Sequence, residues 1–320
     1  MLHLLYLLLG IGLLTAGGEV LIRGSLAIAK RLGISPLLSG LLIVGFGTSM
    51  PELVVSVDAA INGQPDIAIG NVVGSNIANI LLVLGLCAVI TPLAVSPLSL
   101  RRDAVVVIAA SLLFVLLASG RALSAVDGMI FITALFSYLI WAYWTEQDKS
   151  TLSGALHEAE AAEIEKIPES SLWSAIAVIG GLALLIAGSQ VLLKGAVGIA
   201  NGLGVSEAVI GLTLVAVGTS LPELTISVIA ALRRHADVAV GNILGSNIFN
   251  ILGILGVSAI LQPLTLKGRV LEFDQWIMLG AAFLIFLFLF TDRKLSRIEG
   301  GVLLLGYFTY LFISFFFIES

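Results

Sequence analysis

The chain has 320 residues, of which 58% are hydrophobic and only 12% are charged, and its formal net charge is −5. Because a soluble domain averages about 45–50% apolar and about 25% charged residues, this composition excludes an ordinary soluble globular protein. The one cysteine, Cys87, excludes a disulfide framework and a cysteine-based metal site.

Apolar segments recur along the whole chain, close to or above the roughly 20 residues that cross the hydrocarbon core of a bilayer. We therefore predict an all-α integral membrane protein with ten transmembrane helices at 2–23, 34–61, 66–92, 103–120, 124–145, 172–200, 205–232, 237–262, 272–291 and 297–318. The first segment lacks a small-residue cleavage pattern, so we interpret it as a spanning helix and not as a cleaved signal.

The two halves of the chain repeat each other. Residues 35–92 align with 206–263 without a gap, at a constant offset of 171, and half of the aligned positions are identical. Since each half holds five predicted helices, an odd number, the second half enters the membrane from the opposite side. We therefore predict two inverted five-helix repeats, 1–145 and 171–320, joined by the acidic linker 146–170. In transporters built in this way, the substrate site lies near the membrane midplane, where the repeats meet.

The distribution of Lys and Arg predicts the orientation. If the N-terminus lies outside, the predicted inner loops hold eleven of these residues and the outer loops hold four. Because cytoplasmic loops carry an excess of positive charge, both termini are expected outside and the acidic linker in the cytoplasm.

A carboxylate stands at the same place in an interrupted helix of each half, because the run GFGTSMPE (45–52) returns as AVGTSLPE (216–223). Pro51 and Pro222 cannot donate a backbone hydrogen bond, so each helix is expected to break there and to turn a carbonyl toward protein or a hydrated cavity. Each copy places two hydroxyls and one carboxylate on one helical face: Thr48, Ser49 and Glu52 in the first, and Thr219, Ser220 and Glu223 in the second. Kinks that only aid packing would not explain a carboxylate repeated at one depth, whereas an ion pathway would.

The following helix carries a second repeated motif, GNVVGSNIAN (70–79) and GNILGSNIFN (241–250). Its glycines are four residues apart, which lets helix backbones approach closely. Each copy has a serine and an asparagine one turn apart, Ser75 with Asn79 and Ser246 with Asn250, and we favour both asparagines as cation ligands. The other amides are interpreted as hydrogen bonds between helices: Asn71, Asn76, Asn242 and Asn247.

The combined set offers carboxylates, hydroxyls, amide oxygens and backbone carbonyls, and no His or Cys. An all-oxygen set fits Ca²⁺, Na⁺ or Mg²⁺ and argues against zinc or copper. Two negative charges balance one Ca²⁺ or two Na⁺, which predicts competition at a shared site. An intramembrane enzyme is disfavoured because Ser49 and Ser220 have no His or Lys at membrane depth to activate them. A passive channel is disfavoured because the site has two unequal halves and no pore ring.

These motifs resemble those of the sodium/calcium exchanger family of the cation/calcium exchanger superfamily, whose inverted repeats carry G-T-S-x-P-E on one helix and G-S-N-x-x-N/D on the next. Both motifs occur twice here, at 47–52 with 74–79 and at 218–223 with 245–250. The resemblance implies a secondary antiporter that exchanges Na⁺ for Ca²⁺ by alternating access and needs no cofactor. It also implies that Glu52 and Glu223 coordinate Ca²⁺, and that the Ca²⁺ and Na⁺ sites are completed by Thr48, Ser49, Thr219, Ser220, Ser75, Ser246, Asn79 and Asn250 with backbone oxygens near Gly45 and Ala216.

The resemblance further implies that the first and sixth helices slide across the other eight on smooth glycine faces formed by Gly10, Gly12, Gly17, Gly18, Gly180, Gly181 and Gly188. The short linker indicates the prokaryotic type without cytosolic regulatory domains. Such a protein is expected to act as a monomer in the plasma membrane, with the lipid bilayer and inorganic cations as its partners and no nucleic acid. Asparagine at both Asn79 and Asn250 departs from the many members with Asp at one of these positions. The alternative function is a H⁺-coupled Ca²⁺/cation antiporter on the same scaffold, although that branch usually has a different motif around its glutamate.

Overall fold

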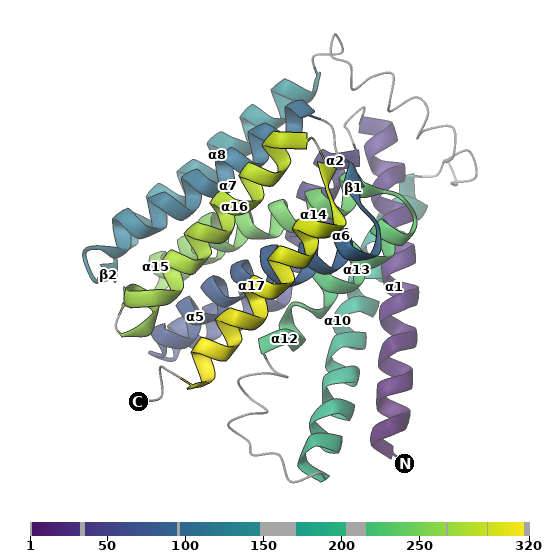
Figure 1. Cartoon of the computed structure of the whole chain (residues 1–320), viewed down its shortest axis with the longest axis horizontal. Coiled ribbons are helices and arrows are strands. Elements are labelled where there is room, and N and C mark those ends of the chain that lie inside the picture. Colours follow the sequence, from purple (N-terminus) through teal and green to yellow (C-terminus); the bar gives the residue numbers. More distant parts are fainter. Residues whose placement is uncertain are drawn as a thin grey trace.

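The computed structural model describes residues 2–32, 36–94, 97–147, 171–202, 216–266, 268–292 and 294–316. Most of these residues are helical, and the long helices run side by side (Figure 1). The prediction of a helical protein is thereby confirmed. The predicted linker beyond residue 147 and the start of the predicted segment 205–232 lie outside the described residues.

Helices, including π-helices (η), occur in each predicted segment. The first half contains α1 (Leu2–Leu32), α2 (Pro36–Ser39), η1 (Gly40–Gly45), α3 (Phe46–Thr48), α4 (Met50–Ile61), α5 (Pro65–Ile77), η2 (Ala78–Leu84), α6 (Gly85–Ile90), α7 (Pro97–Ala118) and α8 (Ala125–Gln147). The second half contains α10 (Ser171–Gly202), α12 (Ala216–Thr219), α13 (Leu221–Leu232), α14 (Ala236–Ile248), η4 (Phe249–Ile254), α15 (Leu255–Leu261), η5 (Val270–Asp274), α16 (Gln275–Asp292) and α17 (Arg297–Phe316). By length and composition, six helices among the described residues could cross a membrane, or seven if Gly40–Thr48 and Met50–Ile61 form one bent span.

Two features of the helices differ from the prediction. α1 ends at Leu32, whereas the prediction ended this helix at residue 23. The charged residues that follow the apolar stretch do not end the helix, because each is favourable where it stands. Arg23 bonds Glu19 one turn earlier at 2.8 Å, and Lys30 and Arg31 lie in the last turn, where the helix dipole favours positive charge. The π-helical segments were not predicted, since hydrophobic periodicity does not reveal one extra residue in a turn.

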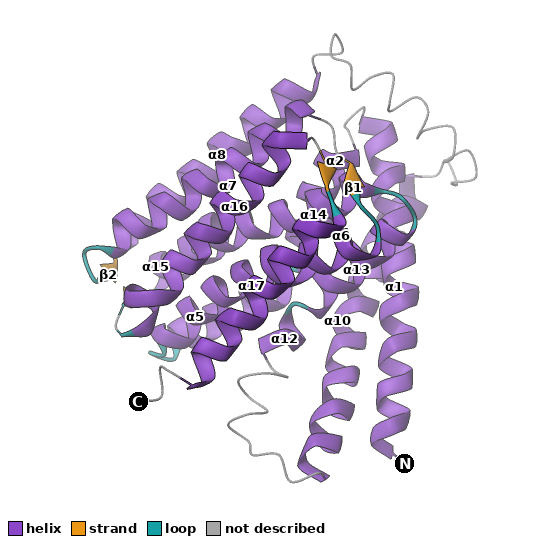
Figure 2. Cartoon of the chain, in the orientation of Figure 1, coloured by secondary structure: helices purple, strands orange, loops and turns teal. Residues whose placement is uncertain are grey.

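Short β-ladders connect the loops of the two halves. β1 (Leu93–Ala94) pairs antiparallel with β4 (Lys294–Leu295), and β2 (Ala122–Leu123) pairs antiparallel with β3 (Leu264–Thr265). Figure 2 shows strands at two separate places on the helical body. Each ladder takes one strand from each half, so the halves are joined by backbone hydrogen bonds at two places far apart in the sequence.

α1 and α10 form a closely packed antiparallel pair at one side of the molecule (Figure 1). Most of the predicted sliding glycines lie inside this pair: Gly10, Gly17, Gly181 and Gly188. A Cβ on Gly181 would lie 2.7 Å from the backbone nitrogen of Leu21 and 2.9 Å from the carbonyl oxygen of Gly17, so the backbones themselves touch. Only Gly18 of the seven faces the rest of the protein, against Ile229 of α13, and Gly12 and Gly180 meet nothing within 4 Å. These glycines therefore serve mainly to join the two helices.

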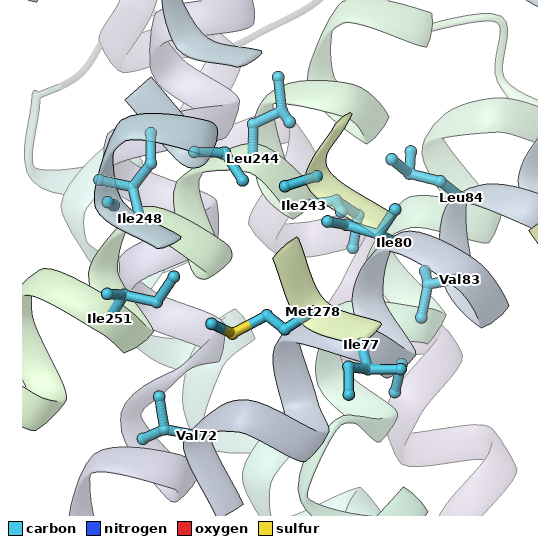
Figure 3. Close-up of a cluster of buried hydrophobic side chains, with 14 of the residues drawn as sticks. Val72, Ile77, Ile80, Val83, Leu84, Ile243, Leu244, Ile248, Ile251 and Met278 are labelled. Carbon is cyan, nitrogen blue, oxygen red and sulfur yellow. The ribbon is translucent and has the colours of Figure 1, made fainter. Parts of the chain in front are cut away.

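The helices that carry the repeated asparagine motif form the centre of the protein. In the most apolar 18-residue stretch of Pro65–Ile90, 72% of the residues are buried, and in that of Ala236–Leu261 the share is 83%. The corresponding share for α1 is 33%, so the two central helices are enclosed by other helices. Their apolar side chains converge in one cluster, in which Met278 of α16 lies between Ile77 and Ile251 (Figure 3). This packing fixes the relative position of the two motif helices, one from each half.

Candidate functional site

The broken helices place both glutamates at a helix start. Ser49 interrupts the helix between α3 and α4, with φ −81° and ψ 8°. Ser220 interrupts the helix between α12 and α13 in the same way, with φ −88° and ψ 9°. The helix axes before and after Ser49 differ by 48°. The proline that follows each break stands in the first turn, where its missing N–H costs nothing. Glu52 and Glu223 therefore lie in first turns, where the positive end of the helix dipole favours a carboxylate.

Each glutamate accepts a hydrogen bond from a serine of the opposite half. Ser49 Oγ donates to Glu223 Oε1 at 2.9 Å, and Ser220 Oγ donates to Glu52 Oε1 at 3.2 Å. All four side chains are buried, with Glu52 only 1% exposed and Glu223 fully enclosed. The structure thus brings the two copies of the motif into direct contact.

The two carboxylates form an enclosed pair, and the described residues place no ion-pair partner beside them. Their charges are close enough to interact. Glu52 Oε2 and Glu223 Oε2 are buried without a hydrogen-bond partner in the described part of the chain. A buried charge is strongly destabilising unless it is paired, so this arrangement favours a bound cation.

Backbone and hydroxyl oxygens from both halves meet beside the carboxylates. Ser246 Oγ donates to the carbonyl oxygen of Gly45 at 3.0 Å, and Thr48 Oγ1 is 3.3 Å from the same oxygen. Gly45 has no room for a side chain, since a Cβ would lie 2.7 Å from the carbonyl oxygen of Asn242. Ser75 Oγ is 3.4 Å from Ser220 Oγ, which adds a further hydroxyl at the serine that contacts Glu52.

Asn79 and Asn250 are enclosed and unsatisfied. Both lie in the first turn of a π-helix, η2 and η4 respectively, a feature that is frequent at functional sites. Asn79 is 1% exposed and Asn250 is fully buried. Neither their amide nitrogens nor their amide oxygens have a hydrogen-bond partner among the described residues. A buried amide atom left unpaired costs about 1–3 kcal/mol, so two equivalent unpaired amides favour a ligand that is not part of the chain.

The other four asparagines of the motif behave in two ways. Asn71 and Asn242 bond neighbouring helices, in agreement with their interpretation as contacts between helices. Asn76 and Asn247 instead donate to a carbonyl of their own helix, at 2.7 and 2.8 Å. Their Oδ1 atoms are buried without a partner in the described part of the chain. Asn76 and Asn247 were therefore not recognised from the sequence as residues with an unpaired amide oxygen. Their place in the repeated GSN sequence is a signal for them, but helical spacing alone does not distinguish them from asparagines that bond between helices.

Thr219 and Ala216, the remaining candidates, lie in the short helix α12. Thr219 ends α12 beside Ser220, and Ala216 begins the same helix. The structure therefore brings Ser49, Glu52, Ser75, Ser220 and Glu223 together by direct hydrogen bonds and places Thr48 and Ser246 on the Gly45 carbonyl. No hydrogen bond links Asn79 or Asn250 to this set in the described chain.

Known proteins are similar to this chain in sequence and in fold over nearly its whole length. The profile of the family described as "Sodium/calcium exchanger protein" matches residues 2–144 and 173–316. CaxA of Alkalimonas amylolytica, assigned as an antiporter, is 39% identical over 97% of this chain and 98% of that protein. The sodium/calcium exchanger MaX1 of Methanosarcina acetivorans is 31% identical over 98% of this chain and 99% of its own length. A solved structure of the sodium-calcium exchanger NCX_Mj, soaked with 2.5 mM Na⁺ and 0.1 mM Ca²⁺, matches with a TM-score of 0.82 and 32% identity over 97% of this chain and 98% of that chain.

Proposed function

The chain belongs to the sodium/calcium exchanger protein family, and on this premise we propose that it exchanges Na⁺ for Ca²⁺ by alternating access at one site shared between its halves. Members of this family transport cations and need no cofactor, so the chain is a membrane transporter and not an enzyme. The transported ions are its substrates. The choice of Na⁺ as the coupling ion is part of the proposal.

The observation that carries the proposal is a set of buried oxygen atoms without partners, arranged in equivalent pairs. Glu52 and Glu223 each leave Oε2 unpaired among the described residues, and Asn79 and Asn250 each leave Oδ1 unpaired. The members of each pair are 171 residues apart, the offset of the sequence repeat. Ca²⁺ takes six to eight oxygen ligands, and Na⁺ is likewise a hard cation, so this set suits both ions. We propose Thr48, Ser49, Ser75, Thr219, Ser220, Ser246 and the carbonyls of Gly45 and Ala216 as the remaining ligands.

We propose that the fold consists of ten transmembrane helices in two inverted repeats, 1–145 and 171–320. The matching breaks at Ser49 and Ser220 support this arrangement, because each is followed by a proline and a first-turn glutamate. The two β-ladders also support it, since β1 and β3 occupy equivalent positions in the two halves and each pairs with a strand of the opposite half.

Access to the site is proposed to alternate through movement of α1 and α10. The glycine contacts between them favour movement of the two helices as one body, because backbone-to-backbone packing would be lost if either moved alone. An ion pair between described residues connects this body to the rest of the protein, since Glu19 of α1 lies 3.2 Å from Arg233, which follows α13. We further propose that the protein acts as a monomer in a prokaryotic plasma membrane with both termini outside, as the distribution of Lys and Arg predicts.

Flux measurements on purified protein in lipid vesicles test the coupling ion. Vesicles loaded with Na⁺ are diluted into Na⁺-free medium containing radioactive Ca²⁺, and a parallel set carries a pH gradient with no Na⁺ on either side. We expect Ca²⁺ uptake that requires the outward Na⁺ gradient and disappears when Na⁺ is equal on both sides. Uptake driven by the pH gradient alone, with no response to Na⁺, would establish the H⁺-coupled alternative instead. Vesicles without protein serve as the control.

A further inference from the structure

Asn71 and Asn242 hold the two glutamates by the same pair of hydrogen bonds. Asn71 Nδ2 donates to the backbone oxygen of Glu52 at 3.2 Å and to Ser56 Oγ at 2.9 Å. Asn242 Nδ2 donates to the backbone oxygen of Glu223 at 3.2 Å and to Ser227 Oγ at 2.8 Å. Each amide thus ties the first turn of the helix that carries a site carboxylate to the central motif helix of the same half.

The chemistry of these partners fixes the orientation of the Asn242 amide. A backbone carbonyl oxygen only accepts hydrogen bonds, so the amide atom that faces Glu223 is the NH₂ group. Its two N–H bonds are used on the Glu223 carbonyl and on Ser227 Oγ. The amide oxygen is therefore directed elsewhere, and it accepts a hydrogen bond from Thr48 Oγ1 of the other half at 3.2 Å.

This bond also determines how Thr48 can bind a cation. Its hydroxyl lies beside Asn242 Oδ1, the carbonyl oxygen of Gly45 at 3.3 Å and the carboxylate of Glu223, and all of these are acceptors. The single hydroxyl proton is used on one of them, so only the oxygen lone pairs remain for a ligand. A hydroxyl binds a cation through those lone pairs.

We propose that Asn71 and Asn242 are positioning residues of the cation site, and that Asn242 couples the Glu223 main chain of one half to the Thr48 hydroxyl of the other. The inference rests on the proposed function, since it assigns these amides to the same site. Asn71 and Asn242 thus have a different role from Asn79 and Asn250, the proposed ligands, whose amide oxygens have no partner in the described chain. Asn242 is fully buried and its amide hydrogen and oxygen atoms are committed, so it supports the ligands without being one.

A double-mutant cycle tests the coupling. Radioactive Ca²⁺ binding to purified protein in detergent is measured for the wild type, Asn242→Ala, Thr48→Val and the double variant. We expect each single substitution to raise the Ca²⁺ Kd about tenfold, because Thr48→Val removes a proposed ligand and Asn242→Ala removes the buried hydrogen bonds that position it. If Asn242 acts through Thr48, the Thr48→Val substitution will raise Kd less than about threefold in the Asn242→Ala background. Equal effects of Thr48→Val in both backgrounds would overturn the proposal, since a merely structural role of Asn242 predicts additivity.

Two further variants keep the test decisive. Ser227→Ala removes one acceptor of Asn242 and leaves the amide in place, so it is a milder change, and we expect Kd to rise in the same direction by about two- to fivefold. An unchanged Kd for Ser227→Ala would contradict the proposal even if Asn242→Ala failed to fold. Asn62→Ala is the matched control, because Asn62 directly follows α4 and its exposed side-chain amide donates to the Asp58 carbonyl of that helix, away from the candidate site.

Sodium-driven uptake by the same preparations separates this proposal from the proposed function. Additive Kd effects together with normal Na⁺-driven uptake would overturn the role of Asn242 alone. Uptake that does not respond to Na⁺ would overturn the proposed coupling ion, and the Kd cycle would still decide the role of Asn242.

Discussion

Substitution of Ser49 by alanine removes a short hydrogen bond between the two halves at the site. Its hydroxyl donates to Glu223 Oε1 at 2.9 Å, and both side chains are fully buried. Hydrogen bonds to charged groups contribute about 1.5–3 kcal/mol, and each 1.4 kcal/mol is about tenfold in an equilibrium constant. We therefore expect Ser49→Ala to raise the KM for Ca²⁺ by about 10- to 150-fold.

The equivalent substitution, Ser220→Ala, is expected to raise the KM for Ca²⁺ by a smaller factor. Ser220 Oγ lies 3.2 Å from Glu52 Oε1 and is shared with Ser75 Oγ at 3.4 Å, so its bond to the carboxylate is longer and divided. The increase in KM is expected near the lower end of the range, about tenfold.

The assay is the initial rate of Na⁺-driven Ca²⁺ uptake into vesicles as a function of Ca²⁺ concentration. Ser111→Ala is the matched control, because Ser111 is equally buried and its hydroxyl donates within its own helix, to the carbonyl of Val107. A KM within twofold of the wild type for Ser49→Ala, in protein that elutes as a single folded species, would refute the assignment of this bond to the site.

Three other predictions follow from the same geometry. Glu52→Gln or Glu223→Gln leaves one carboxylate for a divalent ion, so Ca²⁺ uptake should fall to the level of empty vesicles while the protein remains folded; uptake retained by both variants would contradict the site. Asn79→Asp adds a third acidic side chain among the buried groups, and we expect the Na⁺ dependence or pH dependence of uptake to change; an unaltered profile would place Asn79 away from the ions. Gly181→Leu inserts a side chain where a Cβ already meets backbone atoms of α1 at 2.7–2.9 Å, so the thermal midpoint should drop by several degrees, whereas Gly180→Leu, with nothing within 4 Å, should melt like the wild type; equal melting would argue against the close packing of α1 and α10.

Local sequence was sufficient to predict the two helix breaks at the candidate site. A proline three residues after Thr48 and the same spacing after Thr219 required a break in each helix, and the structure has both breaks. The composition likewise predicted long apolar helices, and the described residues contain six that could cross a membrane by length and composition. These features depend only on backbone chemistry and on residues close together in the sequence.

Contacts between the halves were beyond the reach of sequence patterns. The crosswise bonds from Ser49 to Glu223 and from Ser220 to Glu52 depend on how two helices meet in space, which spacing along one helix does not reveal. The same limit applies to Asn242, because its sequence position is equally compatible with a packing role and only the structure gives its bonds to Glu223 and Thr48.

The glycines of α1 and α10 show a different limit. They were predicted to form smooth faces against the other eight helices, but the structure directs Gly17 and Gly181 toward each other instead of toward the rest of the protein. A face of small residues fits any closely packed helix, so tertiary structure was needed to identify the neighbour.

The most direct test of the central claim is the position of a bound divalent ion. Crystals soaked with Sr²⁺, measured for anomalous scattering, would locate the ion independently of any transport assay. We expect one strong peak within about 2.3–2.7 Å of carboxylate oxygens from both Glu52 and Glu223. A peak bound by only one of these glutamates, or strong peaks only at the surface, would contradict a cation site shared by the two halves.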